Sequence, residues 1–281
     1  MTDSSEPRFV DTTLEYFTPP ADGSKPWTSI NVDPTTGERA SNWEYATHAV
    51  KVENLRGRAE ATLDKNGFQF FYHPAKYTSF ANDEEILREY YPESTELIKQ
   101  LTGASRVVLF DHKESVRRRH PDVPDTPQAR QPVPAVHVDQ TNESAITRVQ
   151  RHLPPDDVEG LLQGGFQIIN LWRPIHHAAY DWPLALCDCN SIDRSRDLVS
   201  TTLKYPDHDG ETYSVVWNES HRWKYVRGLT PEEGVLIKCF DSIQDGSVAV
   251  LTAHTAFEDP TTPPDAEKRE SIEVRALVFY D

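Results

Sequence analysis

The chain has 281 residues, enough for one large domain or two small ones, and its 45 acidic and 29 basic residues give a formal net charge of −16. This acidity argues against a nucleic-acid partner, which calls for a basic surface, and we interpret it as favouring solubility. No apolar run approaches the roughly 20 residues that span a bilayer. Residues 1–6 also lack the basic and apolar regions of a secretory signal. We therefore expect a cytoplasmic protein with no membrane partner.

Residues 1–45 are rich in Pro, Thr, Asp and Asn, with aromatic residues among them. We expect an irregular N-terminal arm that packs on the domain, because a purely disordered tail would lack the aromatics. No strong linker or internal repeat follows, so residues 46–281 are predicted to form a single domain. Its first third is predicted to contain strands at 47–53, 67–73 and 106–112, a helix at 83–101 that Pro92 interrupts, and a Pro-rich loop at 121–134 that follows a solvated basic patch, Arg117–Arg119.

The remainder of the chain alternates like a β protein after one short helix. The helix is predicted at 156–162, behind two prolines and ahead of two glycines. The predicted strands are 166–172, 184–188, 213–217, 223–226, 234–240, 247–253 and 271–280. Many short strands with few late helices predict a mainly β fold with flanking α-helices, arranged as a jelly roll or barrel.

His137 and Asp139 stand two residues apart in a segment with strand character. Side chains at i and i+2 of a strand project from the same face, so an imidazole nitrogen and a carboxylate oxygen should lie close together. These are two ligands of the 2-His-1-carboxylate facial triad, which holds Fe(II) and leaves three positions open. The alternative is a chance His-x-Asp pair on an ordinary surface strand.

The third ligand has two candidates later in the chain. His254 precedes a Pro-rich loop, 259–264, and then Arg269 and Ser271 at the start of a predicted strand. His221 begins a strand-like segment, but no Arg-x-Ser follows it at hairpin distance. We favour His254 and keep His221 open as the rival, whose alternative role is a pocket or core imidazole.

A candidate anchor for a dicarboxylate lies on the last predicted strand. Alternation places Arg269, Ser271, Glu273 and Arg275 on one face. A guanidinium fork and a nearby hydroxyl suit the far carboxylate of such a ligand. Arg275 has two interpretations: a carboxylate anchor, or a structural partner of an acid such as Glu273. Asn170 likewise either reaches the metal-side carboxylate of a co-substrate or makes a structural hydrogen bond.

The motifs occur in an order that resembles the hydroxylase/desaturase family of fungal and bacterial secondary metabolism, over residues 40–281. That family includes the fungal gibberellin desaturase and a component of cephamycin methoxylation. The motifs are His137-Val138-Asp139-Gln140, Asn170-Leu171-Trp172-Arg173-Pro174-Ile175, Pro183-Leu184-Ala185-Leu186-Cys187-Asp188, His221-Arg222-Trp223, Phe240-Asp241-Ser242, His254-Thr255-Ala256-Phe257 and Arg269-Glu270-Ser271-Ile272-Glu273-Val274-Arg275.

The resemblance implies a double-stranded β-helix, a cupin-like jelly roll. It implies that His137, Asp139 and His254 occupy the metal positions and that Arg269 and Ser271 anchor 2-oxoglutarate. The implied activity is that of a non-haem iron dioxygenase, which uses Fe(II), 2-oxoglutarate and O2. Such an enzyme would hydroxylate, desaturate or oxidatively cyclise a small-molecule secondary metabolite by ferryl hydrogen abstraction.

Two other functions compete with this hypothesis: a metal-dependent cupin-type enzyme that does not use 2-oxoglutarate, and a catalytically silent jelly roll that binds a small molecule. The substrate, the outcome of the oxidation and the oligomeric state stay open, with a homodimer among the options.

Overall fold

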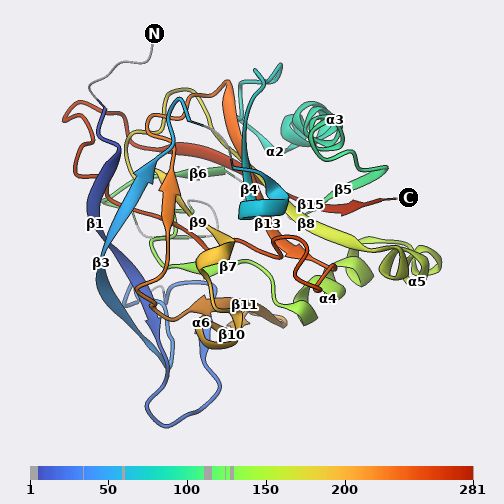
Figure 1. The fold of residues 1–281 in the computed structure, drawn as a ribbon, viewed down its shortest axis with the longest axis horizontal. Coiled ribbons are helices and arrows are strands. Elements are labelled where there is room, and N and C mark those ends of the chain that lie inside the picture. Colours follow the sequence, from blue (N-terminus) through green and yellow to red (C-terminus); the bar gives the residue numbers. More distant parts are fainter. Residues whose placement is uncertain are drawn as a thin grey trace.

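A computed structural model of the chain describes residues 6–33, 35–58, 61–110, 116–123, 125–126 and 130–280. Two curled β-sheets pack against each other, and the helical run at residues 83–102 lies at the outside of the smaller sheet (Figure 1). Among the described residues the larger sheet has nine strands and the smaller has six. One of these six pairs with a single strand and lies off the main strand order. The mainly β architecture predicted from the many short strands is confirmed.

The larger sheet carries strands from both ends of the chain. In sheet order they are β1 (Phe9–Thr18), β3 (Glu44–Asn54), β12 (Trp223–Tyr225), β9 (Leu184–Cys187), β14 (His254–Ala256), β7 (His137–Val138), β11 (Asp209–Val215), β10 (Leu198–Lys204) and β2 (Trp27–Ser29). The smaller sheet contains β4 (Phe68–Tyr72), β13 (Glu233–Asp241), β8 (Phe166–Pro174), β15 (Glu270–Phe279) and β5 (Arg106–Phe110), with β6 (Val116–Arg118) also paired to β15.

The helices are short, and the π-helical turn in the longest run sits beside a proline. They are α1 (Leu63–Asn66), α2 (Asp83–Glu85), the π-helix η1 (Ile86–Tyr90), α3 (Tyr91–Thr102), α4 (Asn142–His152), α5 (Pro155–Gly164), the 3-10 helix η3 (Cys189–Ser191) and α6 (Arg194–Asp197). The run α2–η1–α3 covers the predicted helix 83–101. Pro92 has no N–H to donate, and the turn before it widens into the π-helix. The predicted interruption of the α-helix at Pro92 is confirmed as this π-helical turn.

Helix α4 begins directly after the His137–Asp139 segment. Its N-terminus has a capping box, because Thr141 accepts from the backbone N–H of Ser144 and the Ser144 hydroxyl accepts from the backbone N–H of Thr141. The Thr141 hydroxyl also donates to Glu211 on β11. These bonds hold the chain end that follows Asp139. The sequence analysis did not predict this helix or strand β10.

Two predicted segments differ from the structure. Residues 9–18 of the expected irregular arm form β1, which pairs with β3 along its whole length because hydrophobic residues alternate there. The strand predicted at 247–253 is wrong. That apolar segment is buried but crosses between the sheets: Thr252 N–H donates to Lys238 O on β13, and Cys187 N–H on β9 donates to Ala253 O. His254 therefore begins a strand and does not end one. Residues 111 and 112 of the strand predicted at 106–112 lie outside the described residues.

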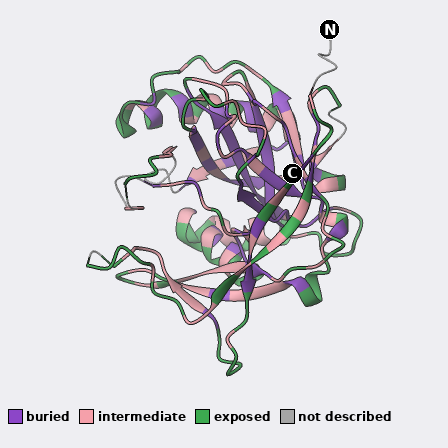
Figure 2. Cartoon of the chain, turned by 90° about the vertical axis from the view of Figure 1, so that its left-hand side faces the viewer, coloured by how far each residue is buried: buried purple, intermediate pink, exposed green. Residues whose placement is uncertain are grey.

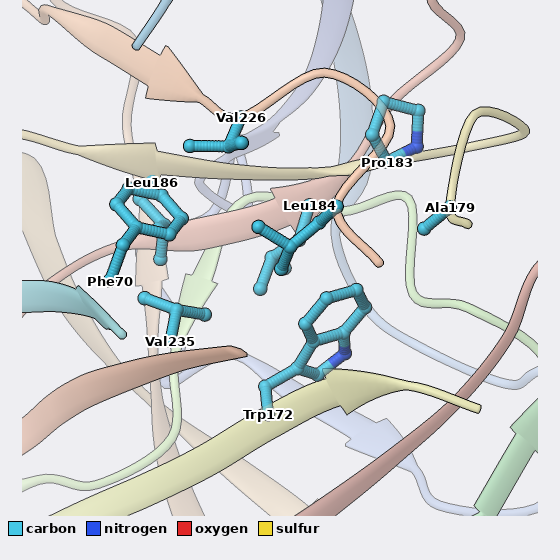
Figure 3. A pocket seen from close by; sticks show the side chains of 9 residues that line it. Phe70, Trp172, Ala179, Pro183, Leu184, Leu186, Val226 and Val235 are labelled. Atoms are coloured by element: carbon cyan, nitrogen blue, oxygen red, sulfur yellow. The ribbon is translucent and has the colours of Figure 1, made fainter. Parts of the chain in front are cut away.

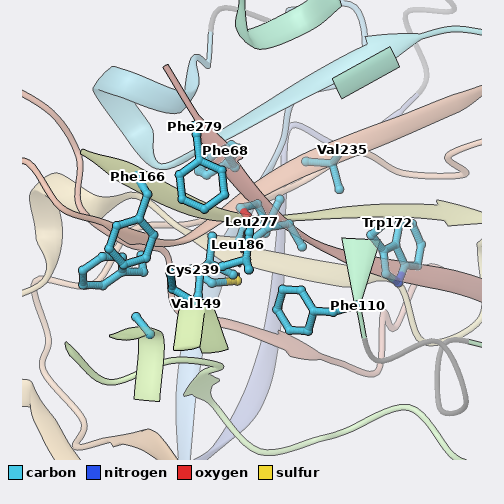
Figure 4. Close-up of a cluster of buried hydrophobic side chains, with 14 of the residues drawn as sticks. Phe68, Phe110, Val149, Phe166, Trp172, Leu186, Val235, Cys239, Leu277 and Phe279 are labelled. Carbon is cyan, nitrogen blue, oxygen red and sulfur yellow. Dashed lines mark hydrogen bonds between the residues drawn. The ribbon is translucent and has the colours of Figure 1, made fainter. Parts of the chain in front are cut away.

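Burial is concentrated in the strands of the smaller sheet, while exposed residues gather on helices and loops (Figure 2). All nine residues of β8 are buried. One of its faces packs under η1 and α3. Its other face meets the larger sheet in an inner core that includes Phe166, Ile168 and Trp172 (Figure 4). Near Trp172 this core leaves a small cavity unfilled (Figure 3).

Candidate active site

The three ligands favoured from the sequence come together on the inner face of the larger sheet. His137 on β7 and His254 on β14 are directly opposite each other in an antiparallel pair, so their side chains share a face. Their ring centroids lie 4.4 Å apart. Asp139 Oδ1 is 3.3 Å from His137 Nε2 and 3.7 Å from His254 Nε2. Among the described residues, one ligand atom from each of the three falls within 4.8 Å of the others, close enough to hold one metal ion.

The hydrogen bonds of the two imidazoles leave the same nitrogen of each free for a metal. His137 Nδ1 lies 2.8 Å from Ala135 O and His254 Nδ1 lies 3.3 Å from Thr252 O. A carbonyl oxygen only accepts, so each Nδ1 carries the hydrogen and each Nε2 presents a lone pair. Burial, reinforced by the neighbouring His137, lowers the pKa of His254 and keeps its ring neutral.

Asp139 supplies an ionised carboxylate to this group. Its side chain is 8% exposed, and burial alone would raise its pKa. The charge of the Arg275 guanidinium is the main cause that outweighs burial, so the pKa of Asp139 lies well below its usual range. Two neutral imidazoles and one carboxylate are the donor set that suits Fe(II) in a facial triad.

Asn170 and Arg275 contact the far oxygen of the same carboxylate. Asn170 Nδ2 donates to Asp139 Oδ2 at 2.8 Å, and Arg275 Nε donates to it at 3.1 Å. The two residues are cross-strand neighbours on β8 and β15, facing the larger sheet. The sequence left each residue two roles, contact with a co-substrate or a structural hydrogen bond. The geometry matches the structural role, because both side chains bond to Asp139 and Arg275 also lies 3.5 Å from Glu273.

Arg269 directly precedes β15 and Ser271 lies near the start of that strand, and both side chains are buried. Arg269 Nη1 donates to Trp182 O at 2.6 Å, and its guanidinium carbon lies 5.6 Å from the Trp172 ring centroid. Its buried Nε has no hydrogen-bond partner among the described residues. Burial, followed by the nearby Arg117, lowers the pKa of Arg269 to about 9, so an anion beside it would stabilise the charged form. A carboxylate fits this environment.

The rival histidine lies in a separate hydrogen-bonded cluster. His221 Nδ1 is 3.1 Å from the Tyr16 hydroxyl, and His221 Nε2 is 3.0 Å from Asp197 Oδ2. The side chain is 2% exposed, and burial lowers its pKa. Both ring nitrogens are occupied by protein partners. The arrangement matches the alternative of a core imidazole.

A cavity of about 150 Å³ opens beside His137 and Asp139. His137, Asp139 and Arg275 line one part of it, and aromatic side chains line another: Phe17, Trp43, Tyr45 and Tyr205. Sequence reasoning missed these aromatics as pocket residues, although the aromatic content of residues 1–45 was the available signal.

Arg117 also lines this cavity, contrary to the expected solvated basic patch. Its segment forms β6 against β15, and Arg117 Nη1 donates to Gln131 O at 2.8 Å. The neighbouring arginines are paired as well, Arg118 with Glu270 and Arg119 with Asp181. The prediction that these arginines form a solvated surface patch is therefore wrong, because pairing with β15 turns their side chains toward the domain.

Comparison with known proteins places the fold and site in a family. A family model described as an oxidoreductase/YMDC permease-like domain matches residues 14–279. The chain therefore belongs to a family of oxidoreductases. It is 35% identical to the hydroxylase/desaturase efuI of Hormonema carpetanum, over 100% of this chain and 98% of that protein. More narrowly, the chain belongs to the hydroxylase/desaturase family within the Fe(II)/2-oxoglutarate-dependent oxygenases, as its motifs indicated.

Two further matches cover nearly the whole chain. The alpha-ketoglutarate-dependent dioxygenase tstK of Talaromyces stipitatus is 32% identical over 95% of this chain and 96% of its own length. The solved structure of the iron and alpha-ketoglutarate-dependent endoperoxidase NvfI superposes with a TM-score of 0.84 at 27% identity, covering 97% of this chain and 98% of that one. This likeness confirms the predicted jelly-roll fold.

Proposed function

We propose that this protein is an Fe(II)/2-oxoglutarate-dependent dioxygenase that hydroxylates, desaturates or oxidatively cyclises a small-molecule secondary metabolite. The observation that carries the proposal is the group of His137, Asp139 and His254 on the inner face of the jelly roll, with their metal-binding atoms within 4.8 Å of one another. The membership in a family of hydroxylases and desaturases agrees with it.

In this proposal three side chains bind the metal and two others hold one of these ligands in place. His137 and His254 offer Nε2 and Asp139 offers Oδ1, while Asn170 and Arg275 fix the carboxylate through Oδ2. Hydrogen-bonded partners of this kind orient metal ligands and raise metal affinity. Imidazole binds a metal as a neutral ligand and carboxylate as an anion, so Fe(II) bound by these three side chains would keep a net charge of +1 and three positions for other ligands.

When bound, Fe(II) with 2-oxoglutarate and O2 supplies the oxidant that removes a hydrogen atom from the substrate, with release of succinate and CO2. Arg269 and Ser271 are proposed to bind the far carboxylate of 2-oxoglutarate, since Arg269 Nε is buried without a partner among the described side chains. The aromatic wall of the cavity would position an apolar part of the substrate and exclude water from the site.

The proposal also covers the location, the partners and the oligomeric state of the enzyme. None of the described helices is long and apolar enough to cross a membrane. We further propose a cytoplasmic enzyme that acts on a small molecule without a nucleic-acid or membrane partner, and the net charge of −16 argues against a polyanionic partner. We also propose a single oxygenase domain over residues 46–281, onto which the residue 1–45 segment packs partly through strands β1 and β2, and leave a homodimer open. Sedimentation of the purified protein checks the oligomeric state.

Spectroscopy without oxygen tests the proposed function. Fe(II) and 2-oxoglutarate added anaerobically should give a weak visible charge-transfer band, and admission of O2 should yield succinate. The Asp139→Ala variant should bind Fe(II) weakly and form no succinate. The matched control is Asp197→Ala, which removes a carboxylate that is also 3.0 Å from a histidine but lies outside the ligand group.

Three results would contradict the proposal. Iron binding without the charge-transfer band or succinate would point to an enzyme that does not use 2-oxoglutarate. Absence of iron binding in folded wild-type protein would favour a silent binding protein. Unchanged iron affinity and turnover in Asp139→Ala would exclude the ligand set.

A further inference from the structure

A cavity of about 10 Å³ lies between the two sheets and is lined by side chains from strands of both (Figure 3). Nine residues line it, and eight of their side chains carry no hydrogen-bonding group. The exception is Trp172, whose indole offers one N–H. The side chains used in the argument below are Trp172, Ala179, Leu184, Leu186, Val226 and Val235.

The size and lining of this cavity indicate which kind of molecule it favours. It is about as large as the space that one water needs, but a buried water makes about three hydrogen bonds. The lining side chains provide one donor, from Trp172, and the backbones of the lining strand residues Trp172, Val235, Leu184 and Leu186 belong to paired ladders. A small apolar molecule loses nothing in such a space, so the cavity favours a gas over water.

Both walls of the cavity adjoin the ligand group. On the larger sheet, Leu186 is the direct cross-strand partner of His254, and Leu184 shares its face two residues away. On the smaller sheet, Trp172 follows Asn170 by two residues on the same face, and Asn170 donates to Asp139 at 2.8 Å. The cavity is therefore separated from the candidate metal ligands by single side chains.

We propose that this cavity is a binding site for molecular oxygen on its way to the metal. The proposal rests on the proposed function for its ligand, since O2 is the small apolar co-substrate of that reaction. The site lies inside the core, apart from the about 150 Å³ cavity that opens beside His137 and Asp139. Oxygen held here would reach the metal without crossing the substrate cavity.

Krypton, an apolar gas of similar size, is the direct probe. Crystals of the protein with Zn(II) in place of Fe(II) are pressurised with krypton, and its anomalous density is located. We expect a peak between Trp172, Leu184 and Val235. Ala179→Val adds two methyl groups to the wall and should lower krypton occupancy on the order of tenfold, as methylene-sized changes in apolar pockets do. Absence of the wild-type peak would overturn the site.

A kinetic arm tests whether oxygen uses the site. In 2-oxoglutarate turnover, Ala179→Val should raise KM for O2 and leave KM for 2-oxoglutarate and kcat at saturating O2 unchanged. The matched control is Ala104→Val, a buried alanine in the core cluster on the other face of the smaller sheet. If Ala179→Val does not fold, Val226→Ile fills the same cavity with a smaller change.

The outcomes separate this inference from the proposed function. An unchanged KM for O2 in a folded, filled variant would refute the oxygen site while turnover stays intact. A wild type that binds krypton but shows no turnover with 2-oxoglutarate would refute the proposed function and the role of oxygen with it.

Discussion

Replacing Asn170 with alanine removes one of the two hydrogen bonds that hold Asp139 Oδ2, and leaves the bond from Arg275 Nε at 3.1 Å. A hydrogen bond to a charged group contributes about 1.5–3 kcal/mol, which corresponds to about 10–100-fold in a binding constant. Loss of a residue that orients a metal ligand has an effect of the same size. We therefore expect the dissociation constant for Fe(II) to rise by about 10–100-fold.

The assay is anaerobic calorimetric titration with Fe(II), repeated with Mn(II), which does not oxidise in air. The chain offers a matched control on the same strand. Gln167 Nε2 donates to Asp241 Oδ2 at 2.7 Å, so Gln167→Ala also removes an amide–carboxylate bond, but away from the ligand group. It should reduce stability and leave metal affinity unchanged.

Two results would refute the reasoning. One is wild-type metal affinity in Asn170→Ala. The other is equal weakening in Asn170→Ala and Gln167→Ala, which would mean that general loosening of β8, and not the orientation of Asp139, controls metal binding.

Further predictions concern the arginines, the rival histidine and pH. Arg269→Lys should raise KM for 2-oxoglutarate on the order of tenfold without changing Mn(II) affinity, because lysine lacks the guanidinium fork; Arg275→Lys should instead weaken Mn(II) binding, and the opposite pattern would exchange their roles. His221→Ala should lower the free energy of unfolding in urea by about 1–3 kcal/mol, since Asp197 loses a buried partner, and should leave Mn(II) affinity unchanged. Burial lowers the pKa of both His221 and His254 from 6.5, so below pH 6.5 the unfolded chain takes up protons before the folded one. Stability of the metal-free protein should therefore fall as pH drops from 6.5 through the lowered pKa values, with a smaller fall in His221→Ala; a flat profile would contradict this.

Local pattern accounts for much of what could be predicted. Runs rich in apolar residues at 166–172 and 271–280 marked β8 and β15, because a strand packed on both faces needs a long apolar run. The same logic failed at 247–253, where an equally apolar segment crosses between the sheets. Burial sets the composition of a segment, whereas strand pairing depends on partners far away in the chain.

The candidate site shows the same difference between what local pattern predicts and what depends on distant parts of the chain. The i, i+2 spacing of His137 and Asp139 and the His254 motif with Arg269 and Ser271 predicted the chemistry of the candidate site, because period-two geometry and donor type are local properties. The choice between His254 and His221 depended on which strand pairs with β7. The contacts of Asn170 and Arg275 with Asp139, the aromatic wall from residues 17–45 and the apolar cavity beside Trp172 depend on how the two sheets face each other, a long-range arrangement that no short stretch of residues encodes.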